Sequence, residues 1–323
     1  MIFPVRDGMD ECVQAIWDSQ EIVLACHVNP DGDAIGSMVG LALGLQVLGK
    51  NVTVLSQDGV PDTLKFLPGT ELVQTSTERR DFDLGIGLDA GDLSRLGGSV
   101  EPINAAKLVM DIDHHVTGGQ FGHVRLLDAE SASTAELVFD FLHALGVEPD
   151  HAMAQNLLCG VLTDTGGFRF PNTRPRTMEI GGALIAAGAS PTEIYESVYE
   201  NQSWAAQKLL GRAIDRMEKS AAGKIVWTVV LQEDFTEFGA TDKETEGIST
   251  ALRAVRGSDI AMLLREQPDG RLRVSLRARE PYDVATVAAK FGGGGHRLAS
   301  GCTLDGPPQE AIQRLLAALQ DTA

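Results

Sequence analysis

Short apolar runs alternate with longer segments through the first 130 residues of the chain. Runs typical of strands lie at residues 22–26, 51–55, 84–88 and 107–112. Between the first two runs, residues 34–48 repeat apolar side chains at helical spacing. This alternation predicts an α/β domain with a mostly parallel sheet and helices on both of its faces.

Helix start and stop signals are clear in the middle of the chain. Ser133-x-x-Glu136 forms a capping box, and an apolar helix is predicted over residues 152–163. Ser190 and Pro191 supply the N-cap and the first turn of a further helix. We expect a helix over residues 203–219 to lead out of this first domain.

A second strand pattern begins at Lys224, and Pro268-Asp269-Gly270 fits the turn of a later hairpin. Strands and helices alternate again from there, which predicts a smaller C-terminal α/β domain with its own sheet. The predicted organisation is a first domain at residues 1–190, a helical linker at 191–222 and a second domain at 223–323.

Length and composition fit two globular domains. The chain has 323 residues, of which 43% are hydrophobic, enough to bury a core in each domain. Its apolar stretches stay below the ~20 residues of a membrane span, and the N-terminus has no basic segment before an apolar one. We therefore expect a cytoplasmic protein. Cysteines without CxxC spacing predict buried reduced thiols, and they are Cys12, Cys26, Cys159 and Cys302.

The charge is strongly negative overall but uneven. A net charge of −18 argues against binding along a long nucleic-acid duplex, because phosphate neutralisation needs clustered Lys and Arg. Between Arg253 and Arg297, however, nine Lys and Arg face five Asp and Glu, a local excess of four positive charges. A small anionic ligand could bind there.

Acidic residues and histidines follow the apolar runs directly. The residues with this placement are His27, Asp31, Asp33, Asp89, Asp113, His114, His115 and Asp164. Because the carboxyl ends of parallel strands meet at one edge of a sheet, loops far apart in sequence can bring these side chains together. Residues 27–33 alone could be only a turn, and Asp89 alone could cap a helix. The three adjacent ionisable residues 113–115 are harder to explain by packing.

Many carboxylates with a few imidazoles and no thiolate favour Mn²⁺, Mg²⁺ or a similar divalent ion over structural zinc. The number of carboxylates suggests two ions. Two ions sharing a carboxylate activate a water molecule and stabilise both oxygens of an in-line phosphoryl displacement, so phosphoester hydrolysis is the natural chemistry.

A glycine run, Gly292 to Gly295, precedes His296 in the second domain. Backbone N–H groups of such a run can converge on a phosphate, with His296 adding a donor. Ser275 and Arg277 are alternate residues of a predicted strand and so share a face. Together these groups predict a phosphate pocket, although the run could also be only a flexible loop.

Four segments of the first domain resemble the motifs of the DHH phosphoesterases. They are HVNPDGDAIGS, LDAGDLSRLG, DIDHHVTG and GVLTDTGGFRF. VSLRAR and DVATVAAKFGGGGHRLASG resemble the DHH-associated C-terminal domain. The family often has Ala-Ala-Gly where this chain has Ala299-Ser300-Gly301.

The resemblance implies roles for named residues. One metal would be held by His27, Asp31 and Asp89, and the other by Asp33, Asp89, His114 and Asp164. Asp89 would bridge the two. His115 would face the scissile phosphate, with Asp113 orienting it. The groups expected to grip the substrate's terminal phosphate or base are Ser275, Arg277, Gly293, Gly294, Gly295 and His296.

Length and domain pair are most similar to the bifunctional oligoribonuclease and 3′-phosphoadenosine-5′-phosphate (pAp) phosphatase subfamily, often called nanoRNases. This implies a hydrolase that uses two divalent ions, Mn²⁺ or else Mg²⁺ or Co²⁺, with its active site in the cleft between the domains. Substrates would be short 5′-phosphorylated RNA or DNA oligonucleotides and pAp, without binding to long duplexes or membranes. Homodimerisation is left open.

Three other functions are compatible with parts of the pattern. A phosphodiesterase for cyclic di-AMP or for the linear dinucleotides pApA and pGpG would use the same metal site with different end recognition. An inorganic pyrophosphatase is expected to carry a Ser-Arg-Lys type motif in its second domain, which this chain lacks. An inactive nucleotide sensor need not keep Asp89 or His115.

Overall fold

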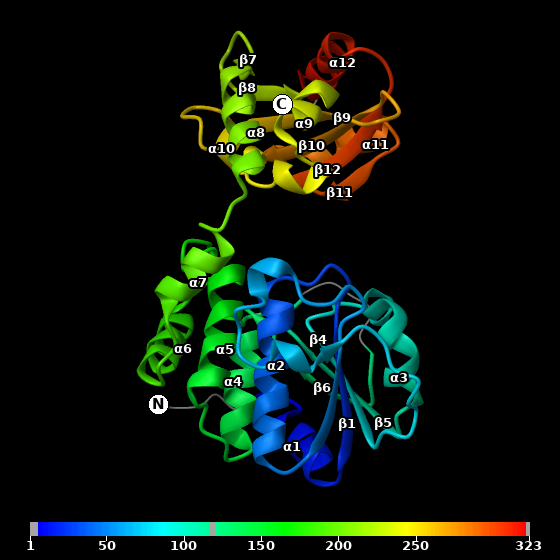
Figure 1. Ribbon diagram of the computed structural model, residues 1–323, viewed down its shortest axis with the longest axis vertical. Helices are drawn as coiled ribbons and strands as arrows, with labels where there is room; N and C mark the ends of the chain where they lie inside the picture. Colours follow the sequence, from blue (N-terminus) through cyan, green and yellow to red (C-terminus); the bar gives the residue numbers. More distant parts are fainter. Residues whose placement is uncertain (1–5, 116–120, 321–323) are drawn as a thin grey trace. The chain divides into compact units, whose positions relative to one another are not determined.

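The computed structural model describes residues 6–115 and 121–320. The chain divides into two compact units, Met1–Asn201 and Gln202–Ala323 (Figure 1). The helical segment expected to link two domains at residues 191–222 is shared between these units. Its first helix, α7 (Pro191–Val198), packs in unit 1, and α8 (Trp204–Asp215) packs in unit 2.

The first unit is built on a sheet of six strands, which is parallel in agreement with the prediction. In spatial order its strands are β3 (Val73–Gln74), β2 (Asn51–Leu55), β1 (Glu21–Cys26), β4 (Leu84–Leu88), β5 (Leu108–Asp113) and β6 (Val124–Leu127). The four predicted strands are confirmed. The pattern missed β3 and β6, which have two and four residues and are too short to show a periodicity.

Helices cover both faces of this sheet, because alternate residues of its central strands are apolar on both sides. Ile22 and Leu24 of β1 enter the larger core, whereas Val23 and Ala25 enter a smaller one. The larger core also receives side chains from α1 (Met9–Trp17), α2 (Gly32–Val47), α4 (Thr134–Ala144), α5 (His151–Asp164), α6 (Pro175–Ala186) and α7. The smaller core is closed by η3 (Leu93–Ser99) and α3 (Val100–Ala105).

A row of glycines on α2 allows this helix to pack closely along α5 (Figure 1). The row is Gly32, Gly36, Gly40 and Gly44, and a Cβ added at any of them would collide with another element. At Gly36 the collision would be with the backbone of α5, at the Asn156 carbonyl and the Gly160 amide. Residues four apart share one helix face, so the close approach is encoded in the spacing.

Helix capping follows the sequence signals. The Ser133 hydroxyl accepts a hydrogen bond from the Glu136 amide at 3.3 Å, and that of Ser190 accepts one from the Glu193 amide at 3.2 Å. In the expected box at α4, the Glu136 carboxylate instead accepts from the Ala132 amide, at 3.2 Å. These caps fix where α4 and α7 begin.

The second unit contains a six-stranded mixed sheet. Its order is β11 (Gly294–His296), β12 (Ala299–Leu304), β10 (Leu272–Ala278), β9 (Ile260–Glu266), β8 (Ile225–Val230) and β7 (Glu218–Lys219). Among the strands described in this sheet, only β8 and β9 pair in parallel. The predicted hairpin turn at Pro268-Asp269-Gly270 joins β9 and β10, with Gly270 at a φ of 80°.

Helices cover the second sheet unevenly. One face packs against α11 (Val284–Lys290) and α12 (Pro308–Gln320). The other packs against α8, α9 (Gln232–Phe238) and α10 (Ile248–Arg253) over β8 and β9. On that second face, alternate residues of β10 are the polar Arg273, Ser275 and Arg277.

The glycine run differs from the expected loop. Gly294 to His296 form the edge strand β11, in which Gly294 pairs with Gly301 and His296 pairs with Ala299. Glycine is disfavoured in strands, so the sequence argued against this outcome. Glycine is required here because a Cβ at Gly295 would lie 2.7 Å from the Ala299 carbonyl oxygen, and its φ is 136°.

Two further expectations can be compared with the structure. All four cysteines are free and buried, as predicted. None of the helices described is both long and apolar enough to cross a membrane. The cytoplasmic location stays a prediction.

The glycine row on α2 gives a first prediction. Gly36→Ala should lower the free energy of unfolding by ~1–3 kcal/mol, because the new methyl group meets backbone atoms that cannot rotate away. Urea denaturation followed by circular dichroism would measure it. The control is Gly182→Ala on α6, where no atom lies within 4 Å of the added Cβ. That change should be neutral or stabilise by up to ~1 kcal/mol, and equal effects of the two would contradict the packing argument.

Candidate metal centre

The sheet register brings three of the predicted residues side by side in the first unit. Cys26 pairs with Leu88, and Leu88 pairs with Ile112. The next residue of each strand is therefore placed at the same edge, and these residues are His27, Asp89 and Asp113. His114 and His115 follow at once. Asp164 reaches them from the C-terminal residue of α5, and Asp31 and Asp33 come from the start of α2.

These side chains form two groups that meet at Asp89. In the first group, His27 Nε2 lies 3.9 Å from Asp31 Oδ1 and 3.6 Å from Asp89 Oδ2. In the second, His114 Nε2 lies 3.5 Å from both Asp89 Oδ1 and Asp164 Oδ2, and 3.9 Å from Asp33 Oδ2. The two carboxylate oxygens of Asp89 thus face different groups, as a bridging ligand requires.

The backbone at Asp89 is in an unusual conformation. Its φ is 56°, in the left-handed region that residues with a Cβ rarely adopt. Asn29, in the loop between His27 and Asp31, has a φ of 53°. Such conformations persist only where the surroundings enforce them, and they concentrate at functional sites.

Burial and charge shift the protonation of the ligands strongly. Burial, and next the Asp89 charge, raise the pKa of Asp33 well above its usual range. Burial, and next the Asp89 carboxylate, raise the pKa of Asp164 to about 6. Burial opposes the charged form of His114, but its contact with Asp89 and the nearby carboxylates outweigh this and raise its pKa to about 10. Without a cation, protons held at Asp33 and His114 therefore offset part of the carboxylate charge.

A divalent cation would replace those protons. Ligand atoms lie within 4.8 Å of one another in three sets of described residues, which are His27, Asp31 and Asp89; Asp33, His114 and Asp164; and Asp89, His114 and His115. Carboxylate oxygens and imidazole nitrogens without thiolates are the ligands expected for Mn²⁺ or Mg²⁺. Asp33 and Asp89 are almost fully buried, and buried carboxylates need compensating positive charge. The residues present fit two divalent ions.

His115 lies beside the two groups and is paired with Asp113. Its Nδ1 is 2.6 Å from Asp113 Oδ1 and 3.6 Å from Asp89 Oδ1. The Asp113 carboxylate also accepts hydrogen bonds from the amides of His115 and Gly91. The hydrogen bond with Asp113 is the largest cause of a raised His115 pKa. Asp113 thus holds the ring in place and favours its protonated form.

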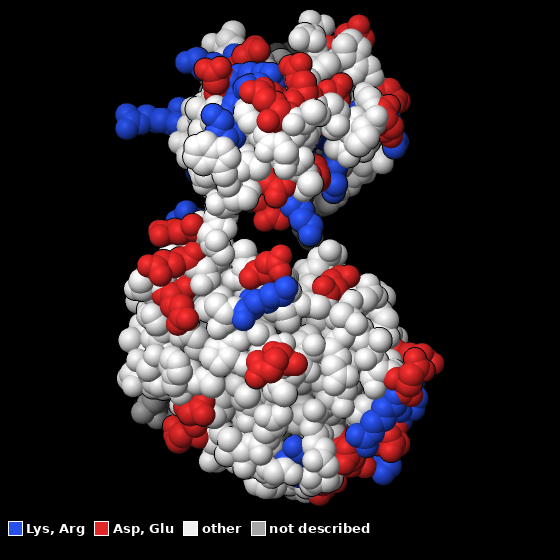
Figure 2. Space-filling view, viewed as in Figure 1, with Lys and Arg blue, Asp and Glu red and all other residues white. Residues whose placement is uncertain are grey.

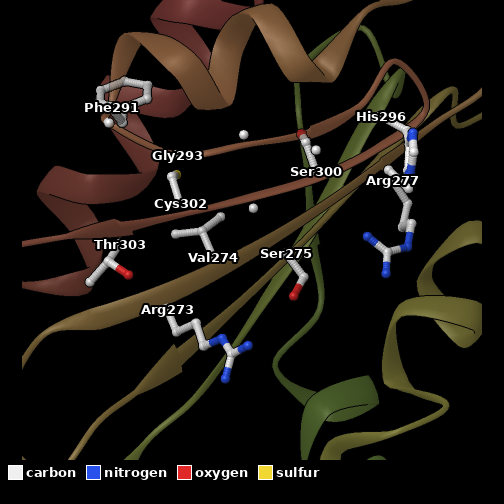
Figure 3. Close-up of a pocket in the computed structure, with 15 residues that line it drawn as sticks. Arg273, Val274, Ser275, Arg277, Phe291, Gly293, His296, Ser300, Cys302 and Thr303 are labelled. Carbon is white, nitrogen blue, oxygen red and sulfur yellow. The ribbon is translucent and has the colours of Figure 1, made fainter. Parts of the chain in front are cut away.

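The predicted substrate-binding residues lie in the second unit. Arg273, Ser275 and Arg277 project from β10 to the same side (Figure 3). Together with the glycine run and His296 they line a groove of about 580 Å³. The Ser275 hydroxyl accepts a hydrogen bond from Arg265 at 3.1 Å. Among the described residues, no carboxylate lies within 4.0 Å of the Arg277 guanidinium, which leaves its charge for a ligand.

Sequence reasoning missed several residues around the metal centre. Thr134 donates from its hydroxyl to Asp89, at 2.9 Å. Asn172 donates to the carbonyl oxygens of Ala132 and Asp164, at 3.0 and 3.2 Å. The capping box at Ser133 located the start of α4. Nothing in the sequence connected that helix end to Asp89, 45 positions before Thr134, or to Asp33, 101 positions before it.

Models of two protein families match this chain. The DHH family, N-terminal domain, matches residues 21–161, which contain all the predicted metal ligands except Asp164. The DHHA1 domain matches residues 202–323. The predicted relationship to the DHH family is therefore confirmed.

Individual relatives are similar to this chain over most of its length. A bifunctional oligoribonuclease and PAP phosphatase NrnA from Thermus thermophilus is 34% identical over 303 residues, covering 93% of this chain and 89% of that protein. The Bacillus subtilis protein of the same name is 29% identical, covering 91% and 92%. A crystal structure of an exopolyphosphatase-related protein from Bacteroides fragilis has a TM-score of 0.89 at 27% identity, covering 97% of this chain and 96% of that one. The chain accordingly belongs to the DHH family and carries a DHHA1 domain in its second unit.

Proposed function

We propose that the chain is a metal-dependent phosphoesterase. It hydrolyses short 5′-phosphorylated oligonucleotides to nucleoside 5′-monophosphates and removes the 3′-phosphate of pAp. The observation that carries this proposal is the position of Asp89, whose two oxygens face separate groups of ligands with His115 alongside. The names of the Thermus and Bacillus relatives support the choice of substrates.

The proposed roles of the ligands follow the two groups. His27, Asp31 and Asp89 hold one cation, and Asp33, Asp89, His114 and Asp164 hold the other. When bound, two divalent ions, which we propose to be Mn²⁺, activate water as a nucleophile and offset the charge of the phosphate.

His115 acts on the leaving group. Because Asp113 occupies Nδ1, the Nε2 atom of the protonated ring is left to donate to the substrate. Proton donation to the departing oxygen stabilises the charge that develops as the phosphoester bond breaks. Asp113 is a positioning residue in this scheme, since it acts through His115.

The second unit selects the substrate. A groove of about 580 Å³ is within the usual size range of small-molecule sites, and its guanidinium groups suit a phosphate. We propose that Arg277, Ser275 and His296 grip the terminal phosphate or base of the substrate. Basic side chains on the visible face occur in small groups beside acidic ones (Figure 2), in keeping with short ligands rather than long duplexes.

A side-by-side assay tests the substrate class. The protein with Mn²⁺ should turn over a 5′-phosphorylated RNA dinucleotide and pAp much faster than a long single-stranded RNA or cyclic di-AMP. A chelator should stop turnover and Mn²⁺ should restore it. Asp89→Asn should abolish turnover, because no other residue in the described part of the chain faces both groups. Preference for cyclic di-AMP would favour a cyclic-dinucleotide phosphodiesterase. Preference for pApA or pGpG over other dinucleotides would favour a phosphodiesterase for linear dinucleotides. Failure on every substrate would favour a nucleotide sensor.

The role of His115 predicts a change in pH dependence. Asp113 raises the pKa of His115, so Asp113→Asn should lower that pKa and make kcat fall at a lower pH on the alkaline side. We also expect a ~10- to 100-fold loss of kcat at the optimum, because the ring loses the partner that orients it for proton donation. The measurement is kcat against pH at a fixed saturating Mn²⁺ concentration.

Asp111→Asn is the matched control, because Asp111 is also a buried aspartate of β5 but accepts no hydrogen bond from His115. It should move the alkaline limb far less. An unmoved limb in Asp113→Asn would assign the proton to another group.

The groove predicts an effect that depends on the substrate. Arg277→Ala should raise KM for the RNA dinucleotide by ~10-fold or more, because a charge-assisted contact to its end is lost. KM for a generic small phosphodiester, which has no such end, should change little. Arg271→Ala is the control, since Arg271 is bound to Asp269 in the β9–β10 turn. Equal effects of Arg277→Ala on both substrates would refute the end-gripping role.

A further inference from the structure

The N-terminus of α4 contacts two of the proposed metal ligands at once. The backbone amides of Thr134 and Ala135 donate to the two oxygens of Asp33, at 2.7 and 2.9 Å. The Thr134 hydroxyl donates to Asp89 Oδ1 at 2.9 Å. Thr134 is completely buried, so water cannot replace its hydroxyl.

This hydroxyl meets the carboxylate whose orientation matters most. Asp89 Oδ1 must face His114 while Oδ2 faces His27, at 3.5 and 3.6 Å. Asp89 directly follows the end of β4, and its backbone has a φ of 56°. The Thr134 hydroxyl donates to Oδ1 but carries no charge. It therefore leaves the negative charge of Asp89 available to a cation.

The threonine itself is held firmly. The Ser133 hydroxyl caps α4, and the amide of Thr134 is occupied by Asp33. The β-branched side chain has few rotamers in a helix, which restricts where its hydroxyl can point. The donor is therefore fixed relative to both Asp33 and Asp89.

We propose that Thr134 is a positioning residue, which sets the rotamer of Asp89 so that one carboxylate can serve both groups of ligands. The proposal rests on the proposed function, since it takes the two groups to be metal sites. It assigns to the Thr134 hydroxyl a share of the cation affinity and to its methyl group only packing.

The test is Mn²⁺ binding to the metal-free full-length protein, measured by isothermal titration calorimetry. Thr134→Val replaces the hydroxyl by a methyl group of similar size and should weaken Mn²⁺ binding ~10- to 100-fold, as is usual when a hydrogen-bond partner of a ligand is lost. Thr134→Ser keeps the hydroxyl and should bind within about threefold of the wild type. In activity assays, kcat for the dinucleotide should fall in Thr134→Val while KM changes little.

Thr228→Val is the matched control. Thr228 is also fully buried, but its hydroxyl donates to the Ala213 carbonyl in the second unit, at 2.6 Å. This change should leave Mn²⁺ affinity unaltered even if it lowers the melting temperature. If Thr134→Val does not fold, as judged by circular dichroism, Thr134→Ala replaces it, since Ala differs from Ser only by the oxygen atom.

The outcomes separate the two proposals. If Thr134→Val binds Mn²⁺ as tightly as the wild type, the proposed role of the hydroxyl is wrong. Equal Mn²⁺ affinities of Thr134→Ala and Thr134→Ser would lead to the same conclusion. Either result would leave the proposed function standing. A wild-type protein that binds no divalent ion and cleaves no phosphoester would overturn the proposed function instead. Weak binding by Thr134→Ser as well as Thr134→Val would show that packing, rather than the hydroxyl, matters at this position.

Discussion

Close packing of α2 against α5 is the constraint on which the candidate metal centre depends. Asp33 stands in the first turn of α2 and Asp164 at the last residue of α5, so the distance between these helices sets the distance between the two carboxylates. A Cβ at Gly160 would lie 2.7 Å from Asp33 Oδ1. The glycines of this interface therefore provide room for helix packing and for the ligand itself. Larger side chains would separate the helices and the ligands together.

The centre is also costly in its electrostatics. Four carboxylates converge in a space where two of them, Asp33 and Asp89, are nearly inaccessible to water. The fold offsets this cost in part through hydrogen bonds from backbone amides and through imidazoles whose pKa the carboxylates raise. The negative charge that these groups do not offset attracts cations strongly. The same buried carboxylates therefore favour ion binding and disfavour folding in the absence of ions.

The sequence predicted the central strands and the segments that carry the ligands, because apolar runs followed by Asp and His are local features. The register that sets Asp89 beside His27 and Asp113 depends on hydrogen bonds between strands and was predicted only as a shared edge. The contact of Thr134 with Asp89 spans 45 positions and left no local signal. The edge strand at Gly294 to His296 was missed because strand propensity argues against glycine, and tertiary pairing with β12 decided the outcome.

The amides at the start of α4 have a further consequence. They belong to a helix held by its cap and core, so they orient Asp33 without the help of an ion. Loading would then require little rearrangement at Asp33, and ions of similar radius would compete for the same carboxylates and imidazoles. Which ion resides there would be decided by supply in the surroundings more than by adaptation of the protein.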